Sequence, residues 1–465
     1  MPPNLHGYER EKPMTTRIAK AYPRKNFFVQ MFTKDISLED CVLDLIDNSV
    51  DGFIRSRGIR LSKIASAVWE KKKAKISTAS LPVIDVTISE AGFEIKDNCG
   101  GIDLDEAINE IFNFGHPFGW ETESLGVYGI GLKRALFKLG DHFEISSQTR
   151  KNGFHCELPV NEWVRKDDSP ADWTIPLTEQ RPASSTGTAG TKITVDQLHS
   201  EVKERLKTGT VEAPLLRAIS TTYAFFLERY VRVKLNGQRV EPLPIPTSKP
   251  SRGSISFDRF SDDGVDIRIL ATIAAQEDPG RYDNTRAGWY VVCNGRAVLS
   301  ADKGEITGWG TPGMPLFQPK HRAFVGVVFF ESRNPMALPW TTTKRSLNRE
   351  SSIYIRTRNR MALAAKPVLS FISKKYPSDP DTTPAERGIA KSMMIATPAE
   401  LATPKASSFF IPIPPPAPKL KQRVQYDVKI SDLDKIRNHL RQPRLSASRI
   451  GEHTFDYFLK QEGLK

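Results

Sequence analysis

Three aspartates and an asparagine fall on neighbouring turns of a predicted helix in the segment DLIDNSVDGF, residues 44–53. Asp44, Asn48 and Asp51 stand at i, i+4 and i+7 and therefore share one face of this helix. Because like charges at this spacing repel one another, the face is either solvated or neutralised by a bound group. An asparagine among carboxylates suits a hard cation such as Mg²⁺, which takes oxygen ligands and keeps waters for contact with phosphates. A separate apolar stripe of the helix consists of Leu38, Cys41, Val42, Leu45 and Ile46.

Further predicted helices and strands follow in an order typical of an α+β layer, a sheet covered by helices on one face. A hairpin around residues 90–92 joins the first two strands. The sequence therefore predicts an α+β domain over residues 31–210, after an N-terminal segment of residues 1–30. The predicted strands are residues 81–89, 92–97, 142–149, 153–160 and 191–196, and the predicted helices are residues 104–114 and 129–140.

A second, α/β unit is predicted over residues 211–376, ending in a long helix from about residue 350. Residues 377–425 are rich in Pro, Ala, Ser and Thr, which is typical of a semi-rigid or disordered linker. Residues 426–465 recover helical spacing and form a small module, too short for a secure core alone, which we expect to dock on a partner. The second unit is predicted to contain a helix over residues 213–230 and strands over residues 231–237, 264–275, 288–299 and 323–330.

Charge and cysteine content limit the partners and the compartment. Lys and Arg number 67 against 54 for Asp and Glu, and the net charge of +13 favours anionic partners such as nucleotides, nucleic acid or acidic proteins. A basic protein with no polymeric ligand fits the charge equally well. Four scattered cysteines without a CxxC pair indicate neither a zinc cluster nor a disulfide framework. The sequence has no signal-peptide core and no stretch near the ~20 apolar residues of a membrane span, so we expect a cytoplasmic protein with no membrane partner.

The turn EIKDNCGGID follows a predicted strand and puts Asp97 at the strand's end, before Gly100 and Gly101. A carboxylate in this position can accept a hydrogen bond from an exocyclic amine such as that of adenine, and the glycines let the backbone approach a flat base. An ordinary Asn/Gly turn is the alternative interpretation.

A glycine-rich loop, SLGVYGIGLKRALFKLG, leads directly into a predicted helix. Its Gly126, Gly129 and Gly131 form a GxxGxG pattern, and exposed backbone N–H groups at a helix N-terminus, with Lys133 in the first turn, favour phosphate binding. The spacing differs from the dinucleotide-binding fingerprint, and no GxxxxGK[ST] phosphate loop occurs. Later, in AGTKITV, Thr191 opens a strand and offers a hydroxyl beside a bound base.

The order of these motifs resembles the ATP-binding domain of the GHKL superfamily, which includes gyrase B, the large heat-shock chaperone ATPases, histidine kinases and MutL. The resemblance covers roughly residues 30–200, and YGIGLK looks closest to MORC and MutL-like members. It implies a Bergerat-type fold that binds ATP and Mg²⁺. Asn48 is implied as the Mg²⁺ ligand, Asp97 as the acceptor of the adenine amine, and Thr191 as its support through water. Further implied cofactor contacts are Asp51, Gly101, Ile102, Gly126, Val127, Tyr128, Gly129, Ile130, Gly131, Leu132 and Lys133.

Two positions depart from the family pattern. Asp44 stands where most hydrolytic members have the glutamate that activates water, and the loss of one methylene is comparable to misplacements that cost about 10²-fold in rate. Cys99 replaces the first glycine of the DxGxG turn. We therefore expect ATP binding to survive, hydrolysis to be slow and the base pocket to be slightly reshaped.

The second unit resembles the transducer domain of gyrase-like and MutL-like proteins. YVVCNGRAVL is similar to the VNGRxV strand of MutL-like transducers, and LPWTTTKRSLN presents Lys344 in a loop before the long helix. The resemblance implies that Lys344 senses the γ-phosphate of ATP, with Arg345 as the competing candidate and a plain surface lysine as the alternative. Such a contact couples ATP occupancy to the relative position of two domains.

We therefore predict a bacterial ATPase in which ATP closes a lid and drives dimerisation through the N-terminal segment, with DNA or a protein as client. DNA maintenance or defence against foreign DNA is the expected context. The alternative is an ATP-dependent switch with little hydrolysis that docks an effector protein through its C-terminal module. A histidine kinase is disfavoured because no helix pair with a phospho-acceptor histidine precedes the domain, and a topoisomerase because no cleavage domain follows.

Overall fold

The computed structural model describes residues 24–65, 80–115, 123–166, 169, 171–184, 187–247, 255–275, 282–375 and 426–464. It divides into two compact units, Met1–Ile411 and Pro412–Lys465, which we describe separately. The linker predicted at 377–425 lies outside the described residues, as does most of the predicted N-terminal strap.

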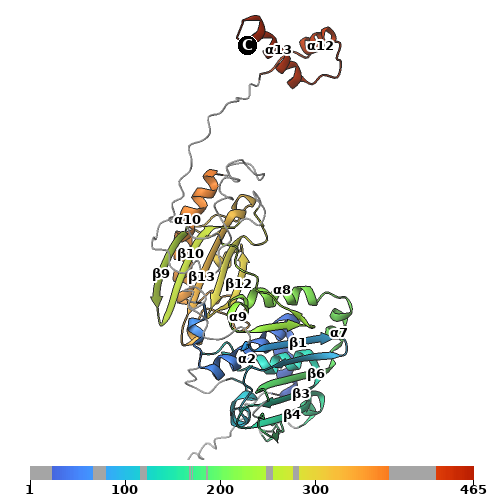
Figure 1. Cartoon of the computed structure of the whole chain (residues 1–465), viewed down its shortest axis with the longest axis vertical. Coiled ribbons are helices and arrows are strands. Elements are labelled where there is room, and N and C mark those ends of the chain that lie inside the picture. The colour runs from blue at the N-terminus through green and yellow to red at the C-terminus, as the bar shows by residue number, and fades with distance from the viewer. Residues whose placement is uncertain are drawn as a thin grey trace, which may run out of the picture. The chain divides into compact units, whose positions relative to one another are not determined.

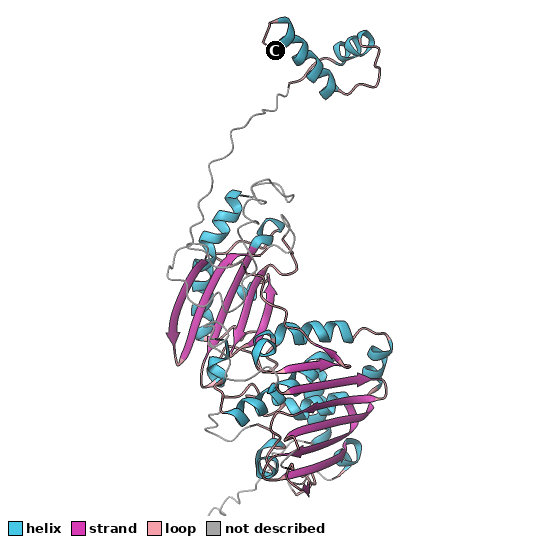
Figure 2. Ribbon diagram, viewed as in Figure 1, coloured by secondary structure: helices cyan, strands magenta, loops and turns pink. Residues whose placement is uncertain are grey.

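An eight-stranded mixed sheet forms the base of the first domain, with strand order β5-β4-β3-β6-β2-β1-β7-β8 (Figures 1 and 2). All neighbouring strands run antiparallel except β1 and β7, which run parallel. This arrangement confirms the predicted α+β fold class. The strands are β1 (Val83–Ser89), β2 (Gly92–Asp97), β3 (Gly140–Gln148), β4 (Gly153–Pro159), β5 (Thr178–Gln180), β6 (Gly190–Leu198), β7 (Arg232–Leu235) and β8 (Gln238–Arg239).

Helices cover one face of this sheet (Figure 1). In β1 the side chains of Ile84, Val86 and Ile88 are buried while Thr87 is exposed, as expected for a strand with one face against a helical layer. The long helix α2 begins after Ser37, whose side chain accepts from the Asp40 N–H, and packs on α5. The helices of this layer and its connections are α1 (Lys25–Lys34), α2 (Leu38–Arg57), α4 (Leu104–Glu106), the π-helical turn η3 (Ala107–Ile111), α5 (Gly131–Leu139), α6 (Val160–Arg165), α7 (Ser200–Lys207), α8 (Glu212–Thr222) and α9 (Ala224–Arg229).

The strand predicted over residues 231–237 belongs to the first sheet. It forms β7 and pairs in parallel with β1, from Val83 opposite Arg232 to Val86 opposite Leu235. A parallel pair needs a long crossover, and α8 and α9 provide its last part. The boundary expected at residue 210 therefore does not separate the two sheets, because the first sheet continues to Arg239.

The second sheet has five strands in the order β12-β11-β13-β10-β9, with β11 and β13 parallel. The single strand predicted over residues 288–299 is a hairpin of two strands. Its turn, Asn294–Gly295, has φ angles of 48° and 85°, which the Asn-Gly pair favours. The long helix α10 (Ser352–Lys375) packs on β10 and β9. The strands are β9 (Ile255–Asp262), β10 (Val265–Ile273), β11 (Gly288–Cys293), β12 (Arg296–Asp302) and β13 (Phe324–Glu331).

Gly326 in β13 lies directly under the indole of Trp289 in β11. A Cβ at this glycine would stand 2.2 Å from Trp289 Cε3, and the tryptophan is fully buried. We expect Gly326→Ala to lower the free energy of unfolding by about 1–3 kcal/mol, because the indole has to leave a packed position. Urea unfolding followed by tryptophan fluorescence checks this. Gly304→Ala is the control, since its Cβ meets ordinary contacts from 3.7 Å outward, and an equal loss in both variants would contradict the steric explanation.

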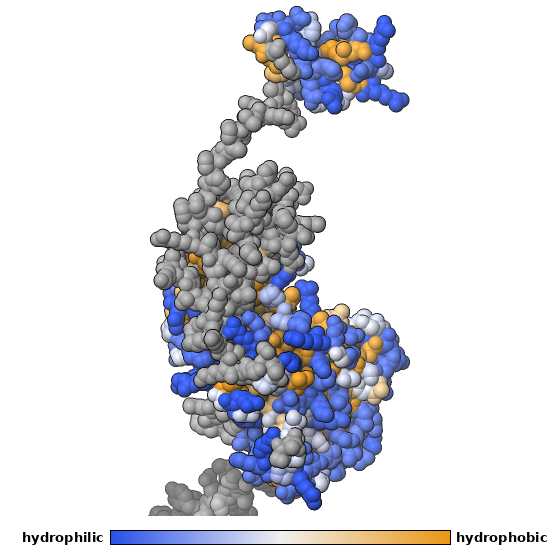
Figure 3. Space-filling view, viewed as in Figure 1, coloured by the Kyte–Doolittle hydropathy of each residue, from blue (hydrophilic) through white to orange (hydrophobic). Residues whose placement is uncertain are grey.

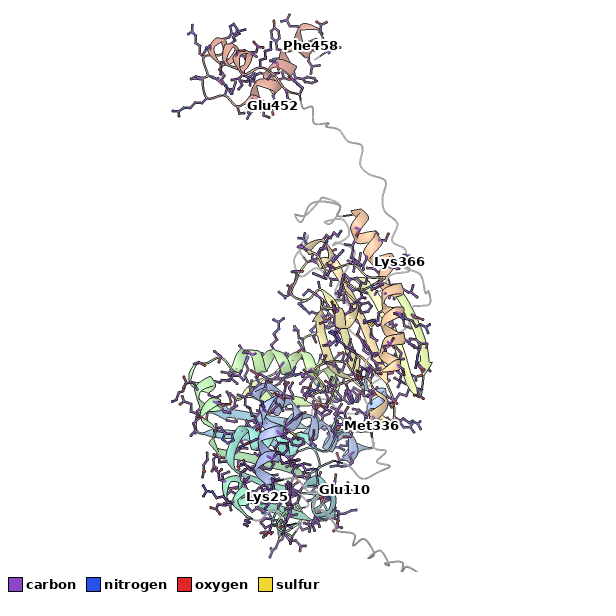
Figure 4. The ribbon with its side chains drawn as sticks, turned by 180° about the vertical axis from the view of Figure 1, so that it is seen from behind. Lys25, Glu110, Met336, Lys366, Glu452 and Phe458 are labelled. Carbon is purple, nitrogen blue, oxygen red and sulfur yellow. The ribbon has the colours of Figure 1, made fainter. Side chains whose placement is uncertain are left out.

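The C-terminal unit contains two helices, α12 (Ile430–His439) and α13 (Ala447–Gln461). Ile450 is its one buried hydrophobic residue among residues 426–464, and apolar side chains are exposed on both helices (Figure 3). Phe458, for example, extends from α13 and is 54% exposed (Figure 4). Such a unit has little core of its own. Over the described part of the whole chain, no helix has the length and apolar composition needed to cross a bilayer.

Candidate functional site

A cavity of ≈ 140 Å³ opens beside α2 in the first unit. Its wall is built from α2, the end of β2, the loop before α5, the start of β6 and a loop of the second sheet's domain that contributes Thr342 and Lys344. Glu110 of η3, which is labelled in Figure 4, also lines it. Every predicted site residue except Val127 lines this cavity; Val127 is 6% exposed and belongs to the hydrophobic core.

Asp97 lines the cavity at the last residue of β2. Its Oδ2 accepts a hydrogen bond from Ser49 Oγ at 2.7 Å, and its Oδ1 accepts from the N–H groups of Cys99 at 2.9 Å and Thr191 at 3.2 Å. Burial raises the pKa of Asp97 above its ordinary value, against the lowering effect of these three donors. Since a carboxylate has about four lone-pair sites, Asp97 keeps capacity for one more donor, such as an adenine amine.

The backbone around Asp97 leaves room for a flat ligand. Gly101 has a φ of 74°, and a Cβ there would stand 2.2 Å from the Gln148 carbonyl oxygen, so no side chain fits between these strand ends. Thr191 Oγ1 lies 2.8 Å from Ser147 Oγ, which accepts from the Ile102 N–H at 2.7 Å. Ser49 and Ser147 complete this polar end, and they are absent from the predicted site.

The glycine loop is fixed to α2 by Asp51. The carboxylate of Asp51 accepts from Ser124 Oγ at 2.6 Å and from the N–H groups of Leu125 at 2.7 Å and Gly126 at 2.8 Å. Burial raises the pKa of Asp51, although these donors lower it. Asp51 therefore holds the loop against α2, and it also lines the cavity.

Asn48 faces the same loop. Its Nδ2 is buried and has no hydrogen-bond partner within the described residues, and its Oδ1 would stand 3.5 Å from a Cβ on Gly126. An unpaired buried amide is rare in proteins, and here it lines a cavity. Such an amide suits a bound group.

Asp44 is paired with cations from two directions. Arg134 Nη2 lies 2.6 Å from Asp44 Oδ2, and Lys344 Nζ lies 3.6 Å from Asp44 Oδ1. Gly131, the first residue of α5, stands against this carboxylate, since a Cβ there would be 3.2 Å from Asp44 Cγ. The spacing of the α2 carboxylates predicts a face that is either solvated or neutralised by a bound group. Side chains of the protein supply much of the positive charge at Asp44.

Lys133 also differs from expectation. Its ammonium donates to the carbonyls of Ile111 at 2.8 Å, of Asn113 at 2.6 Å and of Gly129. All three ammonium protons therefore have carbonyl acceptors. Lys133 joins the segment of Ile111 and Asn113 to the glycine loop, and its protons are not directed at a phosphate. Burial lowers its pKa to about 7.

A buried ion cluster around Asp47 was missed by sequence reasoning. Asp47 is fully buried; Arg296 Nε lies 3.0 Å and Lys344 Nζ 2.6 Å from its oxygens, and the Tyr223 hydroxyl donates to it at 2.6 Å. Burial alone raises the pKa of Asp47, but Arg296 and Lys344 outweigh it and hold the pKa below its ordinary value. The sequence position of Asp47 could have indicated this cluster, because Asp47 falls among the buried residues of α2, where a carboxylate requires a partner.

The side chains of the two candidate sensor residues have different partners. Lys344 lines the cavity and contacts Asp47, whereas Arg345 pairs with Asp40 and does not line the cavity. In total, Asp44 and Asp47 meet Arg134, Arg296 and Lys344, so the ionised cluster has one more positive than negative charge. A buried excess of positive charge favours an anion in the adjoining cavity.

A buried carboxylate at a strand end, a glycine loop before a helix N-terminus and a mixed sheet with helices on one face are consistent with an ATP-binding domain of the Bergerat type. Residues 36–191 match the family model described as Histidine kinase-, DNA gyrase B-, and HSP90-like ATPase. The match supports assignment of this domain to the GHKL superfamily. No curated protein matches the chain.

This superfamily implies Mg²⁺, and the residues present fit it. Asn48 offers one amide oxygen beside the loop, and its amide has no other partner among the described residues. Mg²⁺ in nucleotide sites is commonly held by one or two protein oxygens together with phosphates and water, so one amide oxygen is enough.

Proposed function

We propose that the protein is a Mg²⁺-dependent ATPase whose nucleotide state drives closure of a lid over the phosphates and dimerisation. The observation that supports this most strongly is the cavity itself, which is lined both by the buried Asp97 carboxylate and by Lys344 of the ion cluster. ATP has a complementary form, with an amine-bearing base at one end and a negative triphosphate at the other.

In this proposal each residue has one task. Asp97 accepts the adenine amine, Asn48 holds the metal, and the N–H groups at the start of α5 together with Lys344 bind the phosphates. Asp44 orients and deprotonates the attacking water. When bound, Mg²⁺ neutralises charge on the phosphate oxygens.

A switch with little hydrolysis is the second candidate, and the pairing of Asp44 favours it. Both carboxylate oxygens of Asp44 face cations, Arg134 at 2.6 Å and Lys344 at 3.6 Å. A carboxylate held between two cations is less accessible to an attacking water until a partner leaves. In the switch, the exposed apolar side chains of α12 and α13 dock an effector protein.

Phosphate release by wild type, Asp44→Glu and Asp44→Ala separates the two candidates. For the ATPase we expect a slow wild type, a rate raised about ten-fold or more by Asp44→Glu, whose extra methylene restores reach, and a rate near background for Asp44→Ala. Saturable binding of a non-hydrolysable ATP analogue by all three proteins is the control. Tight binding with no turnover in wild type and Asp44→Glu would establish the switch instead.

We propose further that the protein is of MORC or MutL-like type and acts as a clamp on DNA or on a partner protein. The net charge of +13 and the transducer-like segment NGR, residues 294–296, support this assignment. Size-exclusion chromatography with and without a non-hydrolysable ATP analogue, repeated with duplex DNA, tests it. A dimer that forms only with nucleotide supports the clamp, and a monomer indifferent to both ligands contradicts it.

A further inference from the structure

Asp47 lies beside the proposed nucleotide site without being part of it. It contributes no surface to the cavity, although Asp44 and Asn48 on the same helix do. Its oxygens contact only Arg296, Lys344 and Tyr223 among the described partners. A fully buried carboxylate such as Asp47 lowers stability unless it is paired. The role of Asp47 therefore follows from the residues with which it pairs.

Arg296 connects Asp47 to the backbone of Lys344. Its Nε donates to both Asp47 oxygens, at 3.0 and 3.2 Å, and its Nη1 donates to the Lys344 carbonyl at 2.9 Å. Lys344 has a φ of 54°, a left-handed conformation that residues other than glycine seldom adopt. The guanidinium therefore holds the sensor residue in an uncommon backbone conformation while it neutralises Asp47.

The turn that presents Arg296 is itself fixed. Asn294 donates to the Ser332 carbonyl and accepts from the Ser332 N–H, both at 2.9 Å. Gly295, with a φ of 85°, passes so close to Ile64 of the first domain that a Cβ would stand 2.8 Å from Ile64 Cγ2. Arg296 thus approaches α2 from a rigid support.

The ammonium of Lys344 stands between two carboxylates, and only one of them borders the cavity. It lies 2.6 Å from Asp47 Oδ2 and 3.6 Å from Asp44 Oδ1, and Asp44 lines the cavity. An anion placed in the cavity therefore competes with Asp47 for this ammonium.

We propose that Asp47 and Arg296 are positioning residues for Lys344, and that together they set how strongly the site prefers a nucleotide with a γ-phosphate. This inference rests on the proposed function. Arg296 holds the backbone from which the ammonium reaches the phosphate, and Asp47 competes with the phosphate for the ammonium. The two residues therefore act on the preference in opposite directions.

The test is the ratio of the ADP dissociation constant to that of a non-hydrolysable ATP analogue, measured calorimetrically with Mg²⁺ on the full chain. Arg296→Lys keeps the positive charge but loses the forked contact to the Lys344 carbonyl. We expect its ADP affinity to stay within about two-fold of wild type and the ratio to fall about ten-fold. Asp47→Asn removes the competing charge and is expected to raise the ratio about three-fold or more.

Arg268→Lys is the matched control. Arg268 forms a comparable buried pair with Glu331 at 2.5 Å within the second sheet and does not line the cavity. Its ratio is expected to equal that of wild type. Thermal unfolding of each variant establishes folding, and if Asp47→Asn does not fold, Arg296→Lys decides alone.

The possible outcomes distinguish a failure of the positioning role from a failure of the proposed function. A wild type that binds both nucleotides, with an unchanged ratio in Arg296→Lys, overturns the positioning role and leaves the proposed function intact. An equal fall in Arg268→Lys overturns it as well, because the effect is then general. A wild type that binds neither nucleotide overturns the proposed function and this inference together.

Discussion

Replacing Asn48 by alanine is expected to abolish Mg²⁺-dependent nucleotide binding, lowering the affinity for a non-hydrolysable ATP analogue on the order of 100-fold or more. The amide of Asn48 is buried beside the glycine loop, and its Nδ2 has no partner within the described residues. Its loss breaks no side-chain hydrogen bond among the described residues, so the folded state should keep its stability. Calorimetric titration with Mg²⁺ and with a chelator measures the effect.

The chelator separates a metal ligand from a residue that contacts the nucleotide directly. Without Mg²⁺, wild type and Asn48→Ala should bind the analogue with equal, weak affinity. Asn26→Ala on the exposed face of α1 is the control and should behave as wild type. If Asn48→Ala weakens binding equally with and without Mg²⁺, Asn48 is not the metal ligand.

Asp47→Asn is expected to lower the free energy of unfolding at neutral pH by about 3–5 kcal/mol, because it leaves Arg296 and Lys344 buried without their full counter-charge. This is a large fraction of the 5–15 kcal/mol typical of a domain. Thermal and urea unfolding measure it. Asp262→Asn is the control: its pair with Arg356 is partly exposed, and we expect a loss below about 1 kcal/mol.

The stability of wild type and that of Asp47→Asn should respond differently to acid. The pKa of Asp47 is held below its ordinary value, so its contribution to stability is fully present above the unfolded pKa of about 3.9 and is lost as the pH falls through the folded pKa. The stability difference between wild type and Asp47→Asn should therefore be constant from about pH 7 to 5 and shrink below about pH 4. A difference that stays constant to pH 3 contradicts this role for Asp47.

Local patterns in the sequence predicted the parts of the site that depend on local geometry. The spacing of Asp44, Asn48 and Asp51 fixed a common helix face, and Asp97 with its glycines indicated a strand end. These side chains do line one cavity in the fold. Their individual roles stay predictions, because a shared position in the cavity wall does not show which group each side chain binds.

Contacts across the chain could not be predicted from spacing. Asp47 meets Tyr223, Arg296 and Lys344, which follow it by 176, 249 and 297 positions, and no periodicity links residues so distant. The contacts of Lys133 with the carbonyls of Ile111 in η3 and of Asn113 after it could not be predicted for the same reason. The parallel pairing of β7 with β1 likewise depends on the crossover through α8 and α9.

The central claim is that one Mg²⁺–ATP binds in the cavity with its adenine on Asp97. The most direct test is a titration of the full chain, with Mg²⁺ present, by non-hydrolysable analogues of ATP and of GTP. We predict one equivalent of the ATP analogue per chain and at least about 100-fold weaker binding of the GTP analogue, whose carbonyl opposes the Asp97 carboxylate. Equal binding of both analogues, or saturable binding of neither, would contradict the account.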